Sequence, residues 1–150
     1  LMQELQQEFN MAIILITHNL GVVAETCDNV VVMYAGRPVE HASVKRIFQD
    51  PKHPYTWGLL HSIPKLYERK VRLIPIEGQP PSLIDLPVGC AFAPRCPFAM
   101  EICVKQDPPD YPVGADHYAK CYLHSEYATP EDRKAAETAG LAASTRTGPR

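Results

Sequence analysis

The sequence predicts an α/β fold in which the end of a sheet is followed by a small, irregular, cysteine-rich extension. Residues 12–17 and 30–34 are short apolar runs rich in β-branched side chains, typical of strands buried in a parallel sheet. Apolar residues at helical spacing precede the first run and separate it from the second. The composition then changes, because most of the 15 prolines fall between Pro51 and Pro112, where long regular elements are not expected.

The first part of the chain is expected to alternate helices and strands. Residues 1–9 have the spacing of an amphipathic helix that ends at Asn10. Residues 12–17 form the first expected strand. Asn19 is a favoured N-cap residue and predicts a helix over residues 20–27.

The second apolar run is expected to lead into a tight turn. Ala35 and Gly36 follow it and predict a turn into a strand over residues 37–41, which Pro38 assigns to a sheet edge. A short helix over residues 44–49 is expected next, capped by Ser43. Two parallel strands cannot bury themselves unaided, so further strands are expected from outside this chain.

The residues beyond Pro51 are expected to form short elements. His53 and Pro54 open a helix over residues 55–62, whose Tyr55 and Trp57 are expected to pack in a core. Almost no large apolar side chain follows residue 128, which predicts a disordered tail. The expected division is residues 1–50, 51–126 and 127–150.

Charge and composition narrow the classes of function. The net charge of −2 and the isoelectric point near 6.3 leave no basic stripe, which argues against nucleic acid as a partner. There is no signal-peptide pattern and no run of about 18 apolar residues. The chain begins without methionine and is expected to be a piece of a longer protein in a reducing compartment.

Four cysteines gather in and beyond a proline-rich segment: Cys90, Cys96, Cys103 and Cys121. In a reducing compartment such thiols favour metal ligation over disulfides. Their spacing matches neither the common zinc patterns nor the short ferredoxin run, so spacing does not choose the metal. Tetrahedral zinc and an iron–sulfur cluster both accept four thiolates, and free or oxidised thiols are the third alternative.

Three further residues are assigned structural positions. Cys27 stands apart from the other cysteines and is expected to be a small, buried, hydrophobic side chain. His117 and His124 flank Cys121 and have the chemistry to replace a ligand, but both are expected at the surface.

Several adjacent motifs resemble the last part of the ATPase domain of ATP-binding cassette transporters. They are Thr17-His18 after an apolar run, Leu20-Gly-Val-Val-Ala, Val31-Val-Met-Tyr-Ala-Gly-Arg and Val39-Glu. The sequence that follows resembles the C-terminal extension of the oligopeptide and dipeptide importer branch, in Asp50-Pro-Lys-His-Pro-Tyr-Thr, Gly78-Gln-Pro-Pro-Ser-Leu and Leu86-Pro-Val-Gly-Cys-Ala-Phe-Ala-Pro-Arg-Cys-Pro. The resemblance covers about residues 1–125. It implies the end of the sheet of a P-loop NTPase.

The resemblance implies a catalytic function for His18. In this family the histidine is a switch that reaches the γ-phosphate of ATP and helps to orient the attacking water. Ligands of open α/β sheets gather at the carboxyl ends of strands, where His18 is expected, and an imidazole there can stabilise phosphoryl transfer. A histidine that only caps the next helix is the alternative. The family usually has aspartate after this histidine, whereas Asn19 keeps the cap without the charge.

The resemblance also implies ATP, Mg²⁺, a second ATPase subunit and transmembrane permease subunits, at the cytoplasmic face of the plasma membrane. The sequence has no Gly-x-x-x-x-Gly-Lys-Ser/Thr phosphate loop, so this chain alone is not expected to hydrolyse ATP. Importers of this branch that keep all four cysteines look like carriers of a 4Fe-4S cluster, so the resemblance favours that cluster over Zn²⁺. Arg95 is expected to face water rather than balance the charge of a cluster.

Two rival functions are kept. One is a stand-alone metal-binding interaction module, for which residues 51–126 would fold with metal and without nucleotide. The other is a nonfunctional product of a truncated gene.

Overall fold

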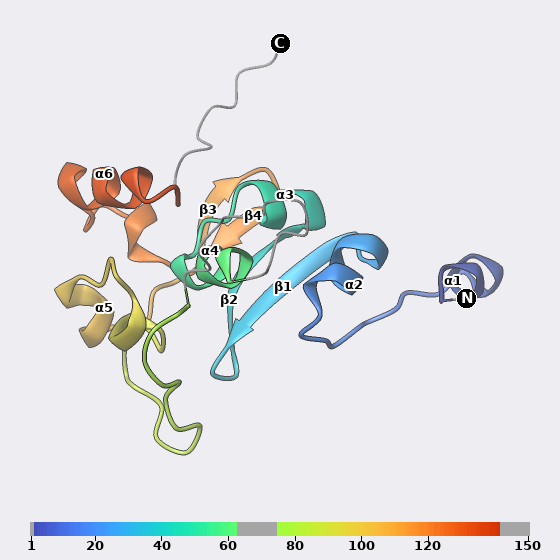
Figure 1. Cartoon of the computed structure of the whole chain (residues 1–150), viewed down its shortest axis with the longest axis horizontal. Coiled ribbons are helices and arrows are strands. Elements are labelled where there is room, and N and C mark those ends of the chain that lie inside the picture. The colour runs from blue at the N-terminus through green and yellow to red at the C-terminus, as the bar shows by residue number, and fades with distance from the viewer. Residues whose placement is uncertain (1, 63–74, 142–150) are drawn as a thin grey trace, which may run out of the picture.

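The computed structural model describes residues 2–62 and 75–141 (Figure 1). No helix within these ranges has both the length and the apolar character needed to cross a membrane. The described helices and strands are α1 (Met2–Phe9), α2 (Leu20–Thr26), β1 (Asn29–Tyr34), β2 (Arg37–Ser43), α3 (Val44–Gln49), α4 (Pro54–His61), α5 (Glu101–Lys105), β3 (Tyr111–Gly114), β4 (His117–Ala119) and α6 (Pro130–Thr138), with 3₁₀ turns η1 (Ala93–Arg95) and η2 (Tyr122–His124).

The sheet has the order β1-β2-β4-β3, and each described pair is antiparallel. The expectation of parallel strands is therefore wrong for the described residues. β2 lies inside the sheet rather than at its edge, because β4 pairs with it at Glu40 and His41. Pro38 lies outside that pairing, beside a register shift in β1, so its missing N–H removes no bond to β4.

The hairpin of β1 and β2 turns where the sequence predicts. Ala35 and Gly36 both have positive φ, at 49° and 75°. Two such residues in succession give the turn whose twist matches that of the flanking strands. The predicted tight turn is confirmed.

The predicted helix starts are confirmed by their caps. The Asn19 side-chain oxygen accepts hydrogen bonds from the backbone N–H groups of Gly21 and Val22 at 3.0 and 3.3 Å. Ser43 caps α3 in the same way. His53 caps α4, because its Nδ1 accepts the Tyr55 N–H at 3.1 Å. Local side-chain chemistry thus fixes these three starts.

Residues 12–17 do not form the buried strand that their composition predicts. They are extended, without a strand partner among the described residues, and Ile14 and Ile16 are 91% and 95% exposed. In Figure 1 this run leads from α2 out to α1, away from the sheet. A run that is apolar on both faces needs a layer on each side, and the described part of the chain supplies neither.

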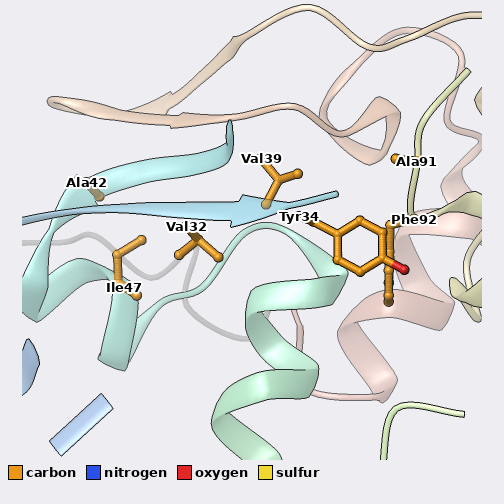
Figure 2. Close-up of a cluster of buried hydrophobic side chains, with 7 residues drawn as sticks. All are labelled: Val32, Tyr34, Val39, Ala42, Ile47, Ala91 and Phe92. Carbon is orange, nitrogen blue, oxygen red and sulfur yellow. The ribbon is translucent and has the colours of Figure 1, made fainter. Parts of the chain in front are cut away.

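One hydrophobic core joins the hairpin to the cysteine segment. Figure 2 shows its buried residues, which are Val32, Tyr34, Val39, Ala42, Ile47, Ala91 and Phe92. The rings of Tyr34 and Phe92 meet edge to face with centroids 5.2 Å apart. Tyr55 packs against both rings, so it lies beside this core as expected. This core fixes where Phe92 and the cysteines beside it lie relative to β1 and β2.

The prediction of a disordered tail is wrong for residues 129–141, and residues 142–150 lie outside the described part. Thr129 and Asp132 form a reciprocal capping box at the start of α6. The small side chain of Ala136 and that of Leu141 are buried in a cluster with Cys121. The composition did not predict this helix because the segment is held against the rest of the protein by only two buried apolar side chains of its own.

Candidate functional site

The four cysteines singled out by the sequence line one small cavity, although they are spread over 32 positions of the chain from Cys90 to Cys121. The cavity measures about 10 Å³, which is room for about one water molecule. Its wall is otherwise mainly apolar and includes Phe98, Met100 and Leu123. Cysteines from four separate segments of the chain therefore line one small, mainly apolar cavity.

Each cysteine is placed by a turn or a short helix. Cys96 ends η1, Cys103 lies in α5 and Cys121 directly precedes η2. Cys90 is tied to α5 because its N–H donates to the Cys103 carbonyl at 2.8 Å. A Cβ added at the neighbouring Gly89 would lie 2.2 Å from that carbonyl oxygen, so only glycine permits this approach.

Burial governs the protonation of three of these thiols. It raises the pKa of Cys90, raises that of Cys96 to about 12, and raises that of Cys121 well above its ordinary value. Backbone N–H groups oppose this effect: those of Phe92 and Leu123 donate toward Cys90 and Cys121. The neighbouring thiols raise the same pKa values further by mutual repulsion of their charged forms. Without a cation, these thiols are protonated at neutral pH.

The cysteine side chains do not form a site for a single ion in the described arrangement. Within the described ranges, no three His, Cys, Asp or Glu side chains form a group that fits one metal ion. Tetrahedral zinc with Zn–S bonds of about 2.3 Å would hold sulfur atoms about 3.8 Å apart. The four cysteines therefore line the same cavity, but their side chains are not arranged as the ligands of one central ion.

A histidine that the sequence assigned only to a helix cap also lines this cavity. His53 is 1% exposed, and its ring packs against Phe92. Burial lowers its pKa to about 4, although the charge of Glu40 acts in the opposite direction. His53 is therefore neutral at physiological pH.

Glu40 is the buried residue that sequence reasoning missed. Its carboxylate accepts hydrogen bonds from the backbone N–H groups of Lys52 and His53 at 2.7 and 2.9 Å. His117 Nε2 donates to the same carboxylate at 2.7 Å. The side chains of Glu40 and His117 are 0% and 2% exposed. One buried carboxylate thus connects β2, the start of α4 and β4.

The expectation that His117 and His124 lie at the surface is wrong. His117 is buried against Glu40, 77 positions away in the sequence. His124 is partly buried, and its Nε2 donates to the Lys52 carbonyl at 2.9 Å. Burial lowers the pKa of His124. Charged residues inside a strand pattern, such as Glu40 after Val39, are the only sequence signal for this network.

Arg95 does more than face water. Its guanidinium donates to the carbonyls of Ile76 and Glu77 at 2.8 Å each, and to the Tyr34 hydroxyl at 3.2 Å. These bonds join η1 to the extended residues before the cysteine segment and to β1. The side chain therefore has a positioning role beside Cys96.

His18 and Cys27 lie outside the cysteine cavity. His18 is exposed, directly after the extended run and before the capped start of α2. Cys27 is half-buried rather than buried, with its sulfur 3.8 Å from the Thr26 hydroxyl. The structure thus separates the candidate nucleotide-contacting residue from the four-cysteine site.

Most of the chain is similar to known proteins. A family described as "Oligopeptide/dipeptide transporter, C-terminal region" matches residues 39–103. A putative peptide import ATP-binding protein of Brucella ovis is 50% identical over 134 residues, which cover 85% of this chain and 40% of that protein.

Two relatives with more specific names show similar identity. The oligopeptide transport ATP-binding protein OppD of Salmonella typhimurium is 53% identical over 108 residues, 72% of this chain and 32% of that protein. The dipeptide transport ATP-binding protein DppD of Lactococcus lactis is 47% identical over 135 residues, 88% of this chain and 39% of that protein. The chain spans about 40% or less of the length of these relatives. Most of the chain is thus similar to oligopeptide and dipeptide transport ATP-binding proteins, and residues 39–103 match the C-terminal region of that transporter family.

Proposed function

We propose that this chain is part of the ATP-hydrolysing subunit that powers the import of oligopeptides or dipeptides across a bacterial membrane. The observation that carries the proposal is identity of about one half to peptide transport ATP-binding proteins over as much as 88% of the chain. The complete subunit would bind ATP and Mg²⁺. It would work at the cytoplasmic face of the plasma membrane with a second ATPase subunit and with permease subunits.

His18 is the residue proposed to contact the γ-phosphate of ATP. Its side chain is exposed at the carboxyl end of the extended run, just before a helix whose first N–H groups are already capped by Asn19. The cap needs Asn19 and not His18, which leaves the imidazole available to a ligand. A neutral imidazole can donate a hydrogen bond to a phosphate oxygen and orient a water molecule.

Replacing His18 tests this assignment in the ATPase subunit that contains this chain. His18→Ala is expected to lower kcat for ATP hydrolysis about 100-fold or more while changing the Kd for ATP little, because orientation is lost and most phosphate contacts remain. Asn19→Asp is the matched control, since it keeps the cap and should retain activity. Equal ATPase rates for His18→Ala and the unchanged protein would refute the role of His18.

We further propose that the four cysteines hold a 4Fe-4S cluster. Two observations support it: the four cysteines line one mainly apolar cavity, and backbone N–H groups donate toward the sulfurs of Cys90 and Cys121. Hydrogen bonds to sulfur and an apolar shell are features that stabilise and tune such clusters. When bound, the cluster would supply a one-electron redox centre and would cross-link the turns that hold it.

The residues around the cavity fit this donor set with one adjustment. At about 10 Å³ the cavity is smaller than a cluster, so the thiol side chains must move apart on binding. Cys90 and Cys96 are best placed to do so, because they lie in the irregular segment around η1 and are only partly buried. Binding would also release the thiol protons whose pKa values burial raises.

Alkylation of the thiols tests the site without reference to activity. In the metal-free chain all five cysteines are free, and they are expected to react with iodoacetamide once the chain is unfolded. After anaerobic loading with iron and sulfide, and a pulse of reagent at a urea concentration that exposes all five thiols of the metal-free chain, mass spectrometry is expected to find Cys27 alkylated and the other four protected. Cys27 serves as the internal control. Protection of Cys27 alone, or of none of the five, would contradict the site.

A further inference from the structure

A second and larger cleft lies beside the cysteine cavity and shares Phe92 and Cys96 with it. Its volume is about 530 Å³, within the range of about 300–1,000 Å³ that small-molecule pockets occupy. Apolar side chains form most of its described wall, among them Trp57, Ile76 and Pro94. Size and lining therefore suit a ligand much larger than an ion.

Arg95 is a cation held in a fixed position on the wall of this cleft. The half-buried guanidinium donates to the carbonyls of Ile76 and Glu77 at 2.8 Å each, and also to the Tyr34 hydroxyl. All three acceptors are uncharged, and within the described residues no carboxylate forms an ion pair with Arg95. A guanidinium has five N–H donors, so two are left without an acceptor in this part of the chain. A carboxylate accepts two such donors in a bidentate pair.

Glu77 supplies an opposite charge on the same wall. The residue is exposed, and its backbone carbonyl accepts the Arg95 Nε–H. Among residues 2–62 and 75–141, its carboxylate forms no ion pair, with Arg95 or with any other cation. A cation and an anion that are neighbours without pairing suit a ligand that carries both charges better than a simple carboxylate.

We propose that this cleft binds a short peptide that has free termini and apolar side chains. The C-terminal carboxylate would pair with Arg95, the N-terminal ammonium with Glu77, and an apolar side chain would lie against Trp57 and Pro94. The proposal rests on the proposed function, because peptide import supplies such molecules at the cytoplasmic face. The ATPase subunit would then bind a product of transport at a site that does not include His18.

Two substitutions on the cleft wall test the proposal. Arg95→Gln removes the charge, and Arg133→Gln is its control, because Arg133 also donates to a backbone carbonyl but lies outside the cleft. Arg95→Gln also loses bonds that position η1, so a second variant is needed. Pro94→Glu adds a carboxylate at an exposed position, where it would compete for Arg95 and repel the peptide carboxylate. Its control is Pro112→Glu, at an exposed proline of β3 outside the cleft.

Isothermal titration calorimetry of the reduced, metal-free 150-residue chain at neutral pH measures binding of the dipeptide leucyl-phenylalanine. Saturable binding to the unchanged chain is expected. Arg95→Gln and Pro94→Glu should each bind at least about 10-fold more weakly, because a charge-assisted pair is lost, and both controls should bind equally well. The C-terminal amide of the dipeptide and 3-phenylpropionate should also bind at least about 10-fold more weakly, because each lacks one of the two charges.

Four outcomes would overturn the proposal. They are the absence of saturable binding by the unchanged chain, equal affinity for the amide, equal affinity for 3-phenylpropionate, and unchanged binding in Pro94→Glu. The second would show that Arg95 does not hold the carboxylate, and the third that the cleft accepts any apolar carboxylate. These measurements need no ATP, so failure of the site leaves the proposed function standing. Failure of the proposed function would appear instead as an ATPase rate that His18→Ala does not change.

Discussion

Glu40→Ala is expected to lower the free energy of unfolding by at least about 3 kcal/mol, which is a large part of the stability of a small domain. The substitution would leave the N–H groups of Lys52 and His53 and the Nε2–H of His117 buried without an acceptor. Each unpaired buried donor costs about 1–3 kcal/mol. Urea unfolding of the metal-free chain under reducing conditions, followed by circular dichroism, measures this change.

The control for this prediction is Glu101→Ala. Glu101 is exposed and, within the part of the chain that the structure describes, pairs with Lys105 alone, so its removal should cost no more than about 0.5 kcal/mol. A Glu40→Ala variant as stable as Glu101→Ala would show that water replaces the lost carboxylate. In that case Glu40 would not be the residue that joins β2, α4 and β4.

Gly89→Ala is expected to have the second largest effect, on the cysteine site in particular. The added Cβ would lie 2.2 Å from the Cys103 carbonyl oxygen and 2.6 Å from that of Val104, and backbone atoms cannot rotate away as a side chain can. Relief requires the chain at Cys90 to withdraw from α5, which breaks the hydrogen bond from Cys90 N–H to Cys103. We expect a loss of about 1–3 kcal/mol in stability and loss of the proposed cluster.

Gly114→Ala is the matched control, because its added Cβ would meet only the His117 side chain, at 3.5 Å. Iron content after identical anaerobic loading, and urea unfolding of the metal-free chains, compare the two variants. Gly89→Ala should lose iron, whereas Gly114→Ala should retain it. Full iron content in Gly89→Ala would mean that the close approach of Cys90 to α5 is not needed for binding.

Elements that depend on neighbouring residues were predictable from the sequence. Asn19, Ser43 and His53 each cap a helix within three residues of themselves, and Ala35 with Gly36 makes a turn on its own. Their chemistry is local, so reading the chain in order finds it.

Features that depend on distant residues were not predictable. Glu40 and His117 are paired although they lie 77 positions apart, and nothing in the sequence around either residue indicates the pairing. Residues 12–17 show the converse. Their apolar pattern indicates a strand that must be covered on both faces, but it does not indicate whether the covering layers are part of this chain. A local pattern indicates what a segment requires, whereas burial depends on what the rest of the protein provides.

The cysteine site falls between these cases. The clustering of four cysteines near prolines was enough to single out these residues, but their spacing could not predict that they line one cavity. The sequence assigned His53 only to a helix cap. That its side chain also lines the cavity depends on contacts with residues distant in the sequence.

The metal content of the chain purified anaerobically tests the cysteine site most directly. Iron, sulfide and zinc analysis with a visible spectrum should be compared between the unchanged chain, Cys96→Ser and Cys27→Ser. The account predicts about four irons and four sulfides per chain with broad absorption near 400 nm, lost in Cys96→Ser and retained in Cys27→Ser. One zinc in a colourless protein, or no metal in the unchanged chain, would contradict it.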